Sequence, residues 1–254
     1  MRDLPIGIFD SGMGGISVLK EMKKLMPYED YIYYGDSKNI PYGTKTKEQL
    51  QKLCIKIGDY FIDRGVKAIV IACNTATSAS VDLFRERYNI PIIGVEPALK
   101  PAIEKYNRGK IVVLATDVTL KEEKFAKLMD RYKDEANIVK IPAPKLVTVV
   151  ENGITSGEEA QRAILETFEG INIKEVSSIV LGCTHYIFLK DAMKKILGDN
   201  IELIDGGVGT ALHLKNILDE KGWLKELKKE GTIQIINSCD DEKKINLTYT
   251  LLRS

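Results

Sequence analysis

Two cysteines each stand where a short apolar run gives way to hydrogen-bonding residues. Cys73 ends the run AIVIAC and precedes the pair NT, and Cys183 ends the run SIVLGC and precedes the pair TH. An ordinary thiol has a pKa of about 8.5 and is only slightly ionised at neutral pH. A helix N-terminus or a nearby histidine stabilises the thiolate. Two opposed thiols can take a proton from one face of a carbon and return one to the other face, which inverts a stereocentre.

Other polar residues follow strand-like runs in the same way. Asp10 either caps the turn that follows it or supplies a carboxylate beside a thiol. His185 either assists Cys183 or is a solvated loop histidine. The glycine-rich segment DSGMGG, which begins at Asp10, resembles a phosphate-binding turn, but it lacks a P-loop lysine and the glycine spacing of a dinucleotide site. Its backbone donors suit a carboxylate equally well.

The remaining cysteines predict no disulfide framework and no zinc site. Cys54 lies on the apolar side of a predicted helix and Cys239 follows a strand-like run, so both are interpreted as structural. The chain has four cysteines at wide spacings, two histidines and no C-x-x-C pair. This pattern indicates free thiols in a reducing compartment.

Composition excludes several classes of protein. Of 254 residues, 44% are hydrophobic and 29% are charged, which is typical of a globular protein of one large or two small domains. The 37 basic and 36 acidic residues give a net charge of +1, so neither nucleic acid nor an anionic membrane is expected as a partner. With no signal peptide recognised and no apolar run near the length of a membrane span, we expect a cytoplasmic protein.

The elements that must position these residues alternate between strand-like and helix-like segments. The apolar runs are mostly continuous, as in strands buried on both faces of a parallel sheet, so the fold class predicted is α/β. Expected strands are Ile6–Asp10, Tyr31–Gly35, Lys67–Cys73, Ile90–Val95, Lys110–Thr116, Ile138–Ile141, Ser177–Cys183 and Ile201–Asp205. Expected helices include Ser17–Met26, Lys47–Arg64, Lys121–Tyr132, Ser156–Glu169 and Phe188–Leu197.

An internal repeat relates the two halves of the chain. The segment 66–75 aligns without gaps on 176–185, so that Cys73 matches Cys183, and the strand 6–11 matches 111–116. The segment 90–94 matches 200–205 at nearly the same offset. We therefore predict two related α/β domains, residues 1–97 with 207–254 and residues 98–206, because the C-terminal part is expected to pack on the first half.

The motifs IFDSGMGG, PYG, ACNTA and LGCTHY, in this order, resemble those of the glutamate racemases, within the aspartate/glutamate racemase superfamily. The resemblance runs from Ile6 to about Gly209. It implies two pseudo-symmetric α/β domains with the active site in the cleft between them. It also implies interconversion of L- and D-glutamate without pyridoxal phosphate or metal, a supply of D-glutamate for peptidoglycan, and so for cell-wall biogenesis and cell shape. Family members are often homodimers.

The resemblance also assigns roles to residues. Cys73 and Cys183 match the two catalytic cysteines, with Asp10 supporting the first thiol and His185 with Glu151 the second. Further positions match the family's substrate-contacting residues: Asp10, Ser11, Pro41, Tyr42, Gly43, Asn74, Thr75, Thr116, Thr184 and His185. This chain has Ile187 and Gly206 where the family commonly has proline and often has serine.

Three other functions fit parts of the pattern. Aspartate racemisation uses the same chemistry, and glutamate is favoured over aspartate only by the family resemblance. A cysteine-dependent isomerase or decarboxylase is a second alternative, although such relatives often keep one thiol and this chain has two. A module that binds nucleotide through the glycine-rich segment, without catalysis, is the third.

Overall fold

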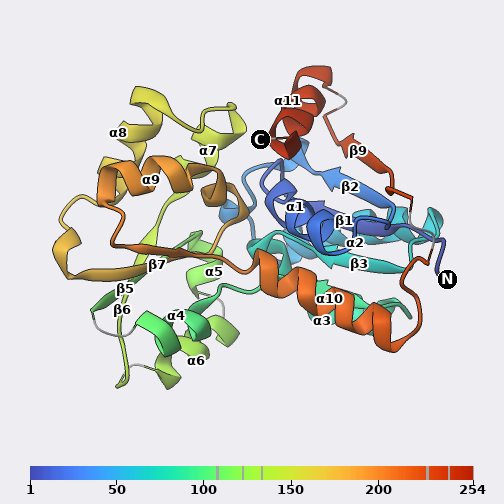
Figure 1. Ribbon diagram of the computed structural model, residues 1–254, viewed down its shortest axis with the longest axis horizontal. Helices are drawn as coiled ribbons and strands as arrows, with labels where there is room; N and C mark the ends of the chain where they lie inside the picture. The colour runs from blue at the N-terminus through green and yellow to red at the C-terminus, as the bar shows by residue number, and fades with distance from the viewer. Residues whose placement is uncertain (107–108, 122, 133, 227–228, 240, 254) are drawn as a thin grey trace. The chain divides into compact units, whose positions relative to one another are not determined.

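A computed structural model describes residues 1–106, 109–121, 123–132, 134–226, 229–239 and 241–253. The chain divides into two compact units, residues 1–95 with 207–254 and residues 96–206 (Figure 1). Each unit is an α/β structure built on one parallel sheet. Within the described residues no helix is long and apolar enough to cross a membrane.

The sheet of the first unit has five parallel strands. Its strands are β1 (Ile6–Asp10), β2 (Tyr31–Gly35), β3 (Ala68–Ile71), β4 (Ile92–Gly94) and β9 (Ile233–Asn237). Their order is β4-β3-β1-β2-β9, so β1 lies at the centre with β2 and β3 beside it. Parallel strands bring their carboxyl ends to one edge of the sheet, and that edge carries Asp10 and Cys73.

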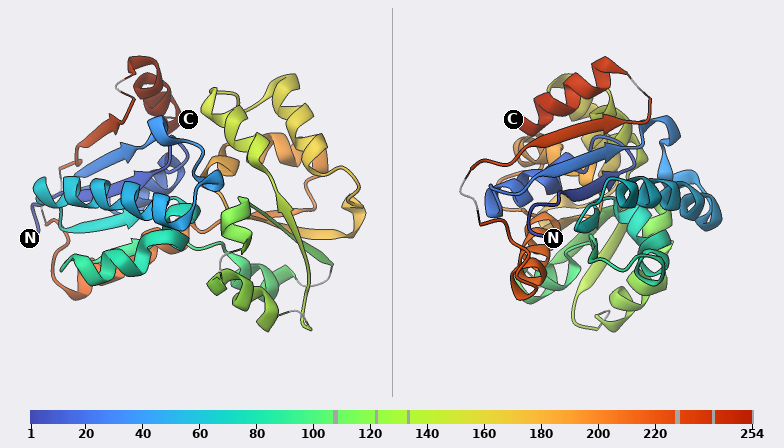
Figure 2. Two further views of the ribbon diagram at one scale, coloured as in Figure 1. Left: turned by 180° about the vertical axis from the view of Figure 1, so that it is seen from behind. Right: turned by 90° about the vertical axis from the view of Figure 1, so that its right-hand side faces the viewer.

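Helices cover both faces of this first sheet (Figure 2). They are α1 (Ile16–Leu25), α2 (Lys47–Asp63), α3 (Asn74–Arg87), α10 (Gly207–Glu220) and α11 (Glu242–Arg253), with short 3-10 turns at Ser37–Asn39 and Tyr42–Thr44. Helix α1 packs against α10 and α11, and α2 packs against α3. The start of α2 is fixed by a reciprocal cap, in which Thr46 Oγ1 accepts from Gln49 N at 3.3 Å and Gln49 Oε1 accepts from Thr46 N at 3.0 Å.

The second unit has a four-stranded parallel sheet in the order β6-β5-β7-β8. The strands are β5 (Lys110–Ala115), β6 (Asn137–Pro142), β7 (Val176–Leu181) and β8 (Glu202–Ile204). The helices are α4 (Leu99–Tyr106), α5 (Asp117–Lys121), α6 (Glu123–Arg131), α7 (Pro144–Glu151), α8 (Gly157–Thr167) and α9 (Lys190–Leu197), with 3-10 turns at Ile173–Glu175 and Thr184–Leu189. Alternate residues of β7 enter two apolar clusters, Ile179 and Leu181 in one and Val180 in the other.

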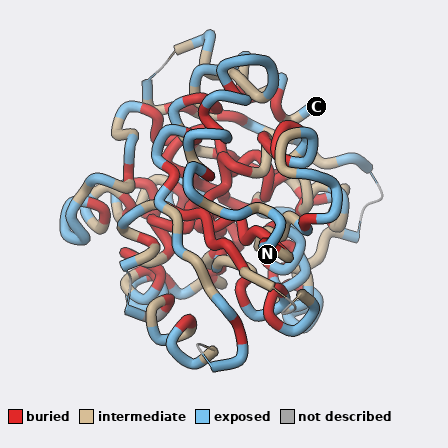
Figure 3. The backbone as a smooth tube through the Cα atoms, turned by 90° about the vertical axis from the view of Figure 1, so that its left-hand side faces the viewer, coloured by how far each residue is buried: buried red, intermediate tan, exposed pale blue. Residues whose placement is uncertain are grey.

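The strand orders confirm the predicted internal repeat. When β1, β3 and β4 are matched with β5, β7 and β8, as the sequence repeat pairs them, the order β4-β3-β1 of the first sheet corresponds to β8-β7-β5 of the second. Strands β2 and β6 then occupy corresponding places beside β1 and β5. The central strands of each sheet are almost wholly buried, β1 and β3 in the first unit and β5 and β7 in the second. Buried backbone is red in Figure 3. The prediction of buried parallel strands is correct for the central strands β1, β3, β5 and β7, whereas β6 and β8 are partly exposed. Strand β9 is an addition to the first sheet alone.

The elements differ from the expected ones mainly at their ends. The strands expected at Lys67–Cys73 and Ser177–Cys183 end two residues before each cysteine, because the chain turns there toward the following helix. The expected helix Lys121–Tyr132 corresponds to α6, and position 122 lies outside the described residues. Strand β9 corresponds to the strand-like run that precedes Cys239, and it lies at the edge of the first sheet next to β2.

Two adjacent serines of β7 lead to opposite predictions of stability. Ser178 Oγ is fully buried and has no hydrogen-bond partner among the described residues, whereas Ser177 Oγ donates to Tyr106 O at 2.6 Å. Ser178→Ala is expected to raise the free energy of unfolding by about 1 kcal/mol, because it removes an unsatisfied polar atom. Ser177→Ala is expected to lower it by about 1 kcal/mol. Urea unfolding midpoints of both variants check this, and a destabilised Ser178→Ala would contradict it.

Candidate active site

The first polar cluster lies at the carboxyl end of β1. Asp10 is fully buried, and its Oδ1 accepts hydrogen bonds from Gly12 N at 2.9 Å and from Ser11 Oγ at 3.4 Å. A Cβ at Gly15 would lie 2.7 Å from Asp10 Cβ and 3.0 Å from Ala72 Cβ. Gly15 is therefore needed for the loop to pack over the ends of β1 and β3. The Asp10 side chain therefore caps the turn that follows it, which was the first of its two predicted roles, and it also lies beside Ser11.

Cys73 is the N-cap residue of α3. Its Sγ accepts from Ala76 N at 3.5 Å and lies 3.6 Å from Ser11 Oγ, toward which the thiol donates. The free backbone donors and the dipole of a helix N-terminus stabilise negative charge at this position. The structure thus brings Cys73, Ser11 and Asp10 together at adjacent strand ends.

Asn74 and Thr75 form the first turn of α3 and are both buried. The side-chain oxygen of Asn74 has no hydrogen-bond partner in the described part of the chain. A buried polar atom of this kind costs about 1–3 kcal/mol unless it is satisfied. Asn74 therefore offers a free acceptor next to Cys73.

The segment Pro41-Tyr42-Gly43 is held by a buried carboxylate that the sequence analysis did not identify. Asp36 follows β2, and its Oδ2 accepts from Tyr42 Oη at 2.7 Å while Asn39 Nδ2 donates to both of its oxygens. Burial, followed by the electrostatic effects of Cys54 and Asp36, raises the pKa of Tyr42 above its ordinary value. The Tyr42 hydroxyl therefore stays protonated and donates. An acidic residue after a strand also fits a turn cap, so sequence alone did not separate the two roles of Asp36.

The second thiol lies at the carboxyl end of β7, in the other unit. Cys183 Sγ lies 3.6 Å from His185 Nδ1, and His185 Nε2 lies 2.7 Å from Glu151 Oε1 at the end of α7. His185 is 1% exposed, so the interpretation of it as a solvated loop histidine is wrong. The order Cys183, His185, Glu151 forms a hydrogen-bonded chain from thiol to carboxylate.

The protonation state of His185 is set by the two hydrogen-bond partners of its imidazole. Burial lowers the pKa of His185, but the hydrogen bonds to Cys183 and Glu151 and their negative charge outweigh it and raise that pKa well above the ordinary value. The imidazolium then donates through both nitrogens, to Glu151 and to Cys183 Sγ. Cys183 Sγ thus faces an imidazole nitrogen, whereas Cys73 Sγ lies at the N-terminus of α3, so the two thiols have different polar neighbours.

The threonines of the second unit also lie near the strand ends. Thr116 follows β5, and its Oγ1 lies 3.1 Å from Thr119 Oγ1 and accepts from Thr119 N at 3.3 Å. Thr184 is buried and begins the 3-10 turn that carries His185. Because β5 and β7 are neighbours in the sheet, Thr116 and Cys183 follow adjacent strands, as Asp10 and Cys73 do in the first unit.

The ion pair between His185 and Glu151 predicts a titration. In Glu151→Gln the His185 pKa is expected to fall, because the buried carboxylate that favours the imidazolium is gone. A raised native pKa contributes stability in full below the unfolded value of about 6.5 and loses it as pH rises through the native pKa. The NMR titration of the imidazole measures the shift, with His213 as the second signal of the chain. An unmoved midpoint in Glu151→Gln would contradict it, and Glu158→Gln, on the exposed start of α8, is the matched control.

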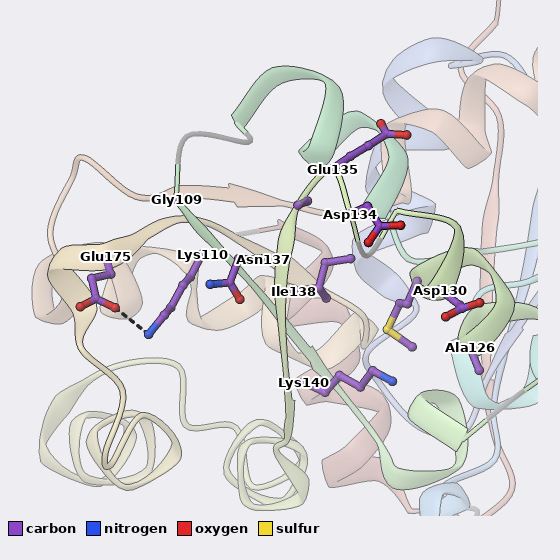
Figure 4. Close-up of a pocket in the computed structure, with 12 residues that line it drawn as sticks. Gly109, Lys110, Ala126, Asp130, Asp134, Glu135, Asn137, Ile138, Lys140 and Glu175 are labelled. Carbon is purple, nitrogen blue, oxygen red and sulfur yellow. Dashed lines mark ion pairs between the residues drawn. The ribbon is translucent and has the colours of Figure 1, made fainter.

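The described residues provide no metal-binding cluster at these strand ends, and the cavity in Figure 4 lies at the opposite edge of its sheet. Among the described residues no group of three or more His, Cys, Asp or Glu side chains could hold a metal ion. An open cavity of about 930 Å³ lies at the amino ends of β5 and β6 and is lined by Met129, Ile138 and the ion pair of Lys110 with Glu175 (Figure 4). Ligands of open α/β sheets bind beyond the carboxyl ends of the strands, the edge opposite to this cavity.

Solved structures similar to this one include glutamate racemases. The structure of glutamate racemase from Francisella tularensis in complex with D-glutamate has a TM-score of 0.83 and 30% identity, over 100% of this chain and 95% of that one. The Escherichia coli glutamate racemase in complex with L-glutamate and activator UDP-MurNAc-ala has a TM-score of 0.87 and 27% identity, over 98% and 94%. The similarity of the fold to these structures identifies an α/β racemase, an isomerase by reaction class.

Sequence comparison gives the family. The family model for Asp/Glu/Hydantoin racemase matches residues 6–213, and the chain belongs to this family. A glutamate racemase of Clostridium botulinum strain Alaska E43 is 50% identical over 255 residues, covering 100% of this chain and 98% of the relative. A glutamate racemase of Clostridium novyi is 50% identical over 243 residues, covering 95% and 94%. The family recognised from the motifs is therefore confirmed.

Proposed function

We propose that this enzyme interconverts L- and D-glutamate without a cofactor, through Cys73 and Cys183 as the two acid–base groups. The observation that carries the proposal is the equivalence of the two thiols. Each follows the corresponding strand of a repeated sheet, and each has its own means of stabilising a thiolate. Removal and return of a proton on opposite faces requires two such groups, one ionised and one protonated.

Each group has a role in this mechanism. Cys73 acts on the face that carries the proton in the D-enantiomer, and Cys183 on the face that carries it in the L-enantiomer. Asp10 supports the first thiol, and His185 with Glu151 supports the second. The Asn74 side-chain oxygen, which lacks a partner in the described residues, supplies an acceptor for the substrate ammonium. The remaining substrate-contacting residues hold the two carboxylates: Ser11, Pro41, Tyr42, Gly43, Thr75, Thr116 and Thr184.

Glutamate is proposed as the substrate because the two relatives about half identical to this chain over nearly their whole length are glutamate racemases. The product D-glutamate would supply peptidoglycan synthesis and thereby cell-wall biogenesis. We propose that the reaction uses neither pyridoxal phosphate nor a metal. We also propose that the enzyme is cytoplasmic and forms a homodimer. Light scattering of the purified protein tests the dimer.

Proton NMR in D2O tests the reaction. The protein, treated with a chelator and without added cofactor, is given each enantiomer of glutamate and then of aspartate. The expected result is loss of the α-proton signal of glutamate with formation of the opposite enantiomer on chiral analysis. Exchange with aspartate alone would make the enzyme an aspartate racemase. No exchange with any of the four, in folded protein with reduced thiols, would refute the proposal.

A further inference from the structure

The C-terminal strand ends beside the turn that leads to the Pro41-Tyr42-Gly43 segment. Strand β9 pairs with β2 along its length, and Asn237 lies opposite Gly35 at the carboxyl edge of the sheet. The 3-10 turn Ser37–Asn39 begins two residues after Gly35. Residues separated by about 200 positions in the sequence are therefore neighbours at this edge.

Two side chains at the end of β9 bind the turn directly. Asn237 Nδ2 donates to Ser37 Oγ at 2.9 Å, and Ser238 Oγ accepts from Lys38 N at 2.9 Å. Asn237 is 7% exposed, and its Oδ1 accepts from Cys239 N at 3.0 Å, so both ends of the amide are used. Ser238 N also donates to Gly35 O at 2.9 Å, which continues the pairing of β9 with β2 to the start of the turn.

The same turn is fixed from its other side by Asp36. This carboxylate holds Tyr42 and Asn39, and its own backbone N donates to Asp10 O at 3.0 Å. Tyr42 is thereby linked through Asp36 to the turn that Asn237 and Ser238 bind. The segment 37–43 is anchored on both sides, by Asp36 within the loop and by the end of β9 at the edge of the sheet.

Close packing at Gly35 joins these contacts to the Asp10 loop. A Cβ at Gly35 would lie 2.8 Å from Gly12 O and 3.4 Å from Asn237 Nδ2. A side chain at this position would push the glycine-rich loop and the Asn237 amide apart. Three segments therefore pack against one another: the Asp10 loop, the end of β2 and the end of β9. Each of them limits the movement of the other two.

We propose that Asn237 and Ser238 are positioning residues for the substrate-binding segment 41–43. This inference rests on the proposed function. Holding a loop in its binding conformation before substrate arrives lowers the entropy cost of binding. Asn237 and Ser238 act through the loop and not on the reacting carbon. Their loss weakens binding of ground state and transition state alike, which raises KM and leaves kcat nearly unchanged.

The test combines kinetics with hydrogen exchange. Asn237→Ala is expected to raise KM for both enantiomers about five-fold, with kcat within about two-fold of the wild type, as for one lost buried hydrogen bond. Amide exchange in segment 37–45 is expected to be faster in this variant, with segment 6–10 unchanged. Thr232→Ala is the matched control: it removes a side-chain hydrogen bond to Asp30 at the opposite end of β9 and is expected to change neither measurement.

A double-mutant cycle shows whether the effect passes through the turn. If Asn237 acts through Ser37, the double variant Asn237→Ala/Ser37→Ala is expected to have the KM of Asn237→Ala alone. Ser238→Ala tests the second contact and keeps the proposal testable where Asn237→Ala does not fold. Unchanged KM and unchanged exchange in the folded variants would overturn the inference. Wild-type protein without racemase activity would instead refute the proposed function, and the exchange measurement would still test the positioning contacts.

Discussion

Serine in place of Cys73 or of Cys183 is expected to lower kcat for racemisation about 10²–10⁴-fold, the typical contribution of a positioned acid–base group. A serine hydroxyl is far less acidic than a thiol, so neither the N-terminus of α3 nor the His185 imidazolium ionises it at neutral pH. Both directions of the reaction should fall together, because each direction uses both groups. Racemisation is measured from L- and from D-glutamate for each variant, with chiral analysis of the product.

Isotope exchange separates the two thiols. Cys73→Ser retains the Cys183 thiol, so any remaining exchange of the α-proton with D2O is expected with L-glutamate, and the reverse holds for Cys183→Ser. Cys239→Ser is the control because Cys239 is exposed and lies outside both clusters. Full racemase activity in either active-site variant would refute the two-thiol mechanism.

Lys67→Met is expected to lower the free energy of unfolding by about 3–5 kcal/mol, as when one partner of a buried ion pair is removed. Lys67 is 0% exposed and Glu29 is 2% exposed, and their Nζ and Oε2 atoms lie 2.5 Å apart. Lys67 Nζ also donates to Arg2 O at 2.8 Å and to Trp223 O at 2.9 Å. The ammonium thus links its own segment to three others of the first unit, at Arg2, Glu29 and Trp223. Glu29 also accepts from Lys225 N, two residues after Trp223.

Charge and packing can be distinguished in this cluster. The double variant Lys67→Met/Glu29→Gln is expected to be more stable than Lys67→Met alone, because the uncompensated carboxylate is gone. Lys24→Met, which removes a more exposed partner of Glu21 on α1, is expected to cost less than about 0.5 kcal/mol. Urea unfolding midpoints measure all three. If Lys67→Met lowers the free energy of unfolding no more than Lys24→Met does, the prediction is wrong.

The elements that the sequence predicts well carry local signals. Strands β1, β3, β5 and β7 each contain a continuous apolar run with a polar or thiol-bearing residue at its end or shortly after it, a pattern that indicates buried parallel strands. The repeat adds a second signal, since it fixes which strands correspond and hence that the two thiols occupy equivalent places. The strand order of both sheets agrees with it.

The features that the sequence does not reveal are those that depend on contacts between residues far apart in the chain. Strand β9 is a short run without a counterpart in the repeat, and it pairs with a strand about 200 residues earlier. Asp36 and Lys67 resemble a turn residue and a strand-end lysine until the fold buries them. Glu151 lies 34 residues before His185, so its contact with the imidazole follows from the packing of α7 against the Thr184–Leu189 turn. From the sequence, only the family resemblance indicated that Glu151 would act beside His185.

The two thiols are chemically alike but have different neighbours, a helix N-terminus for Cys73 and an imidazolium for Cys183. For a racemase in an achiral solvent the two enantiomers have equal free energy, so detailed balance requires the same kcat/KM in both directions at every pH. Unequal surroundings therefore cannot make the enzyme favour one product. They can make kcat differ between the two enantiomers only if KM differs by the same factor. The difference between the two thiol environments is therefore expected as a different KM, and a correspondingly different kcat, for L- and D-glutamate.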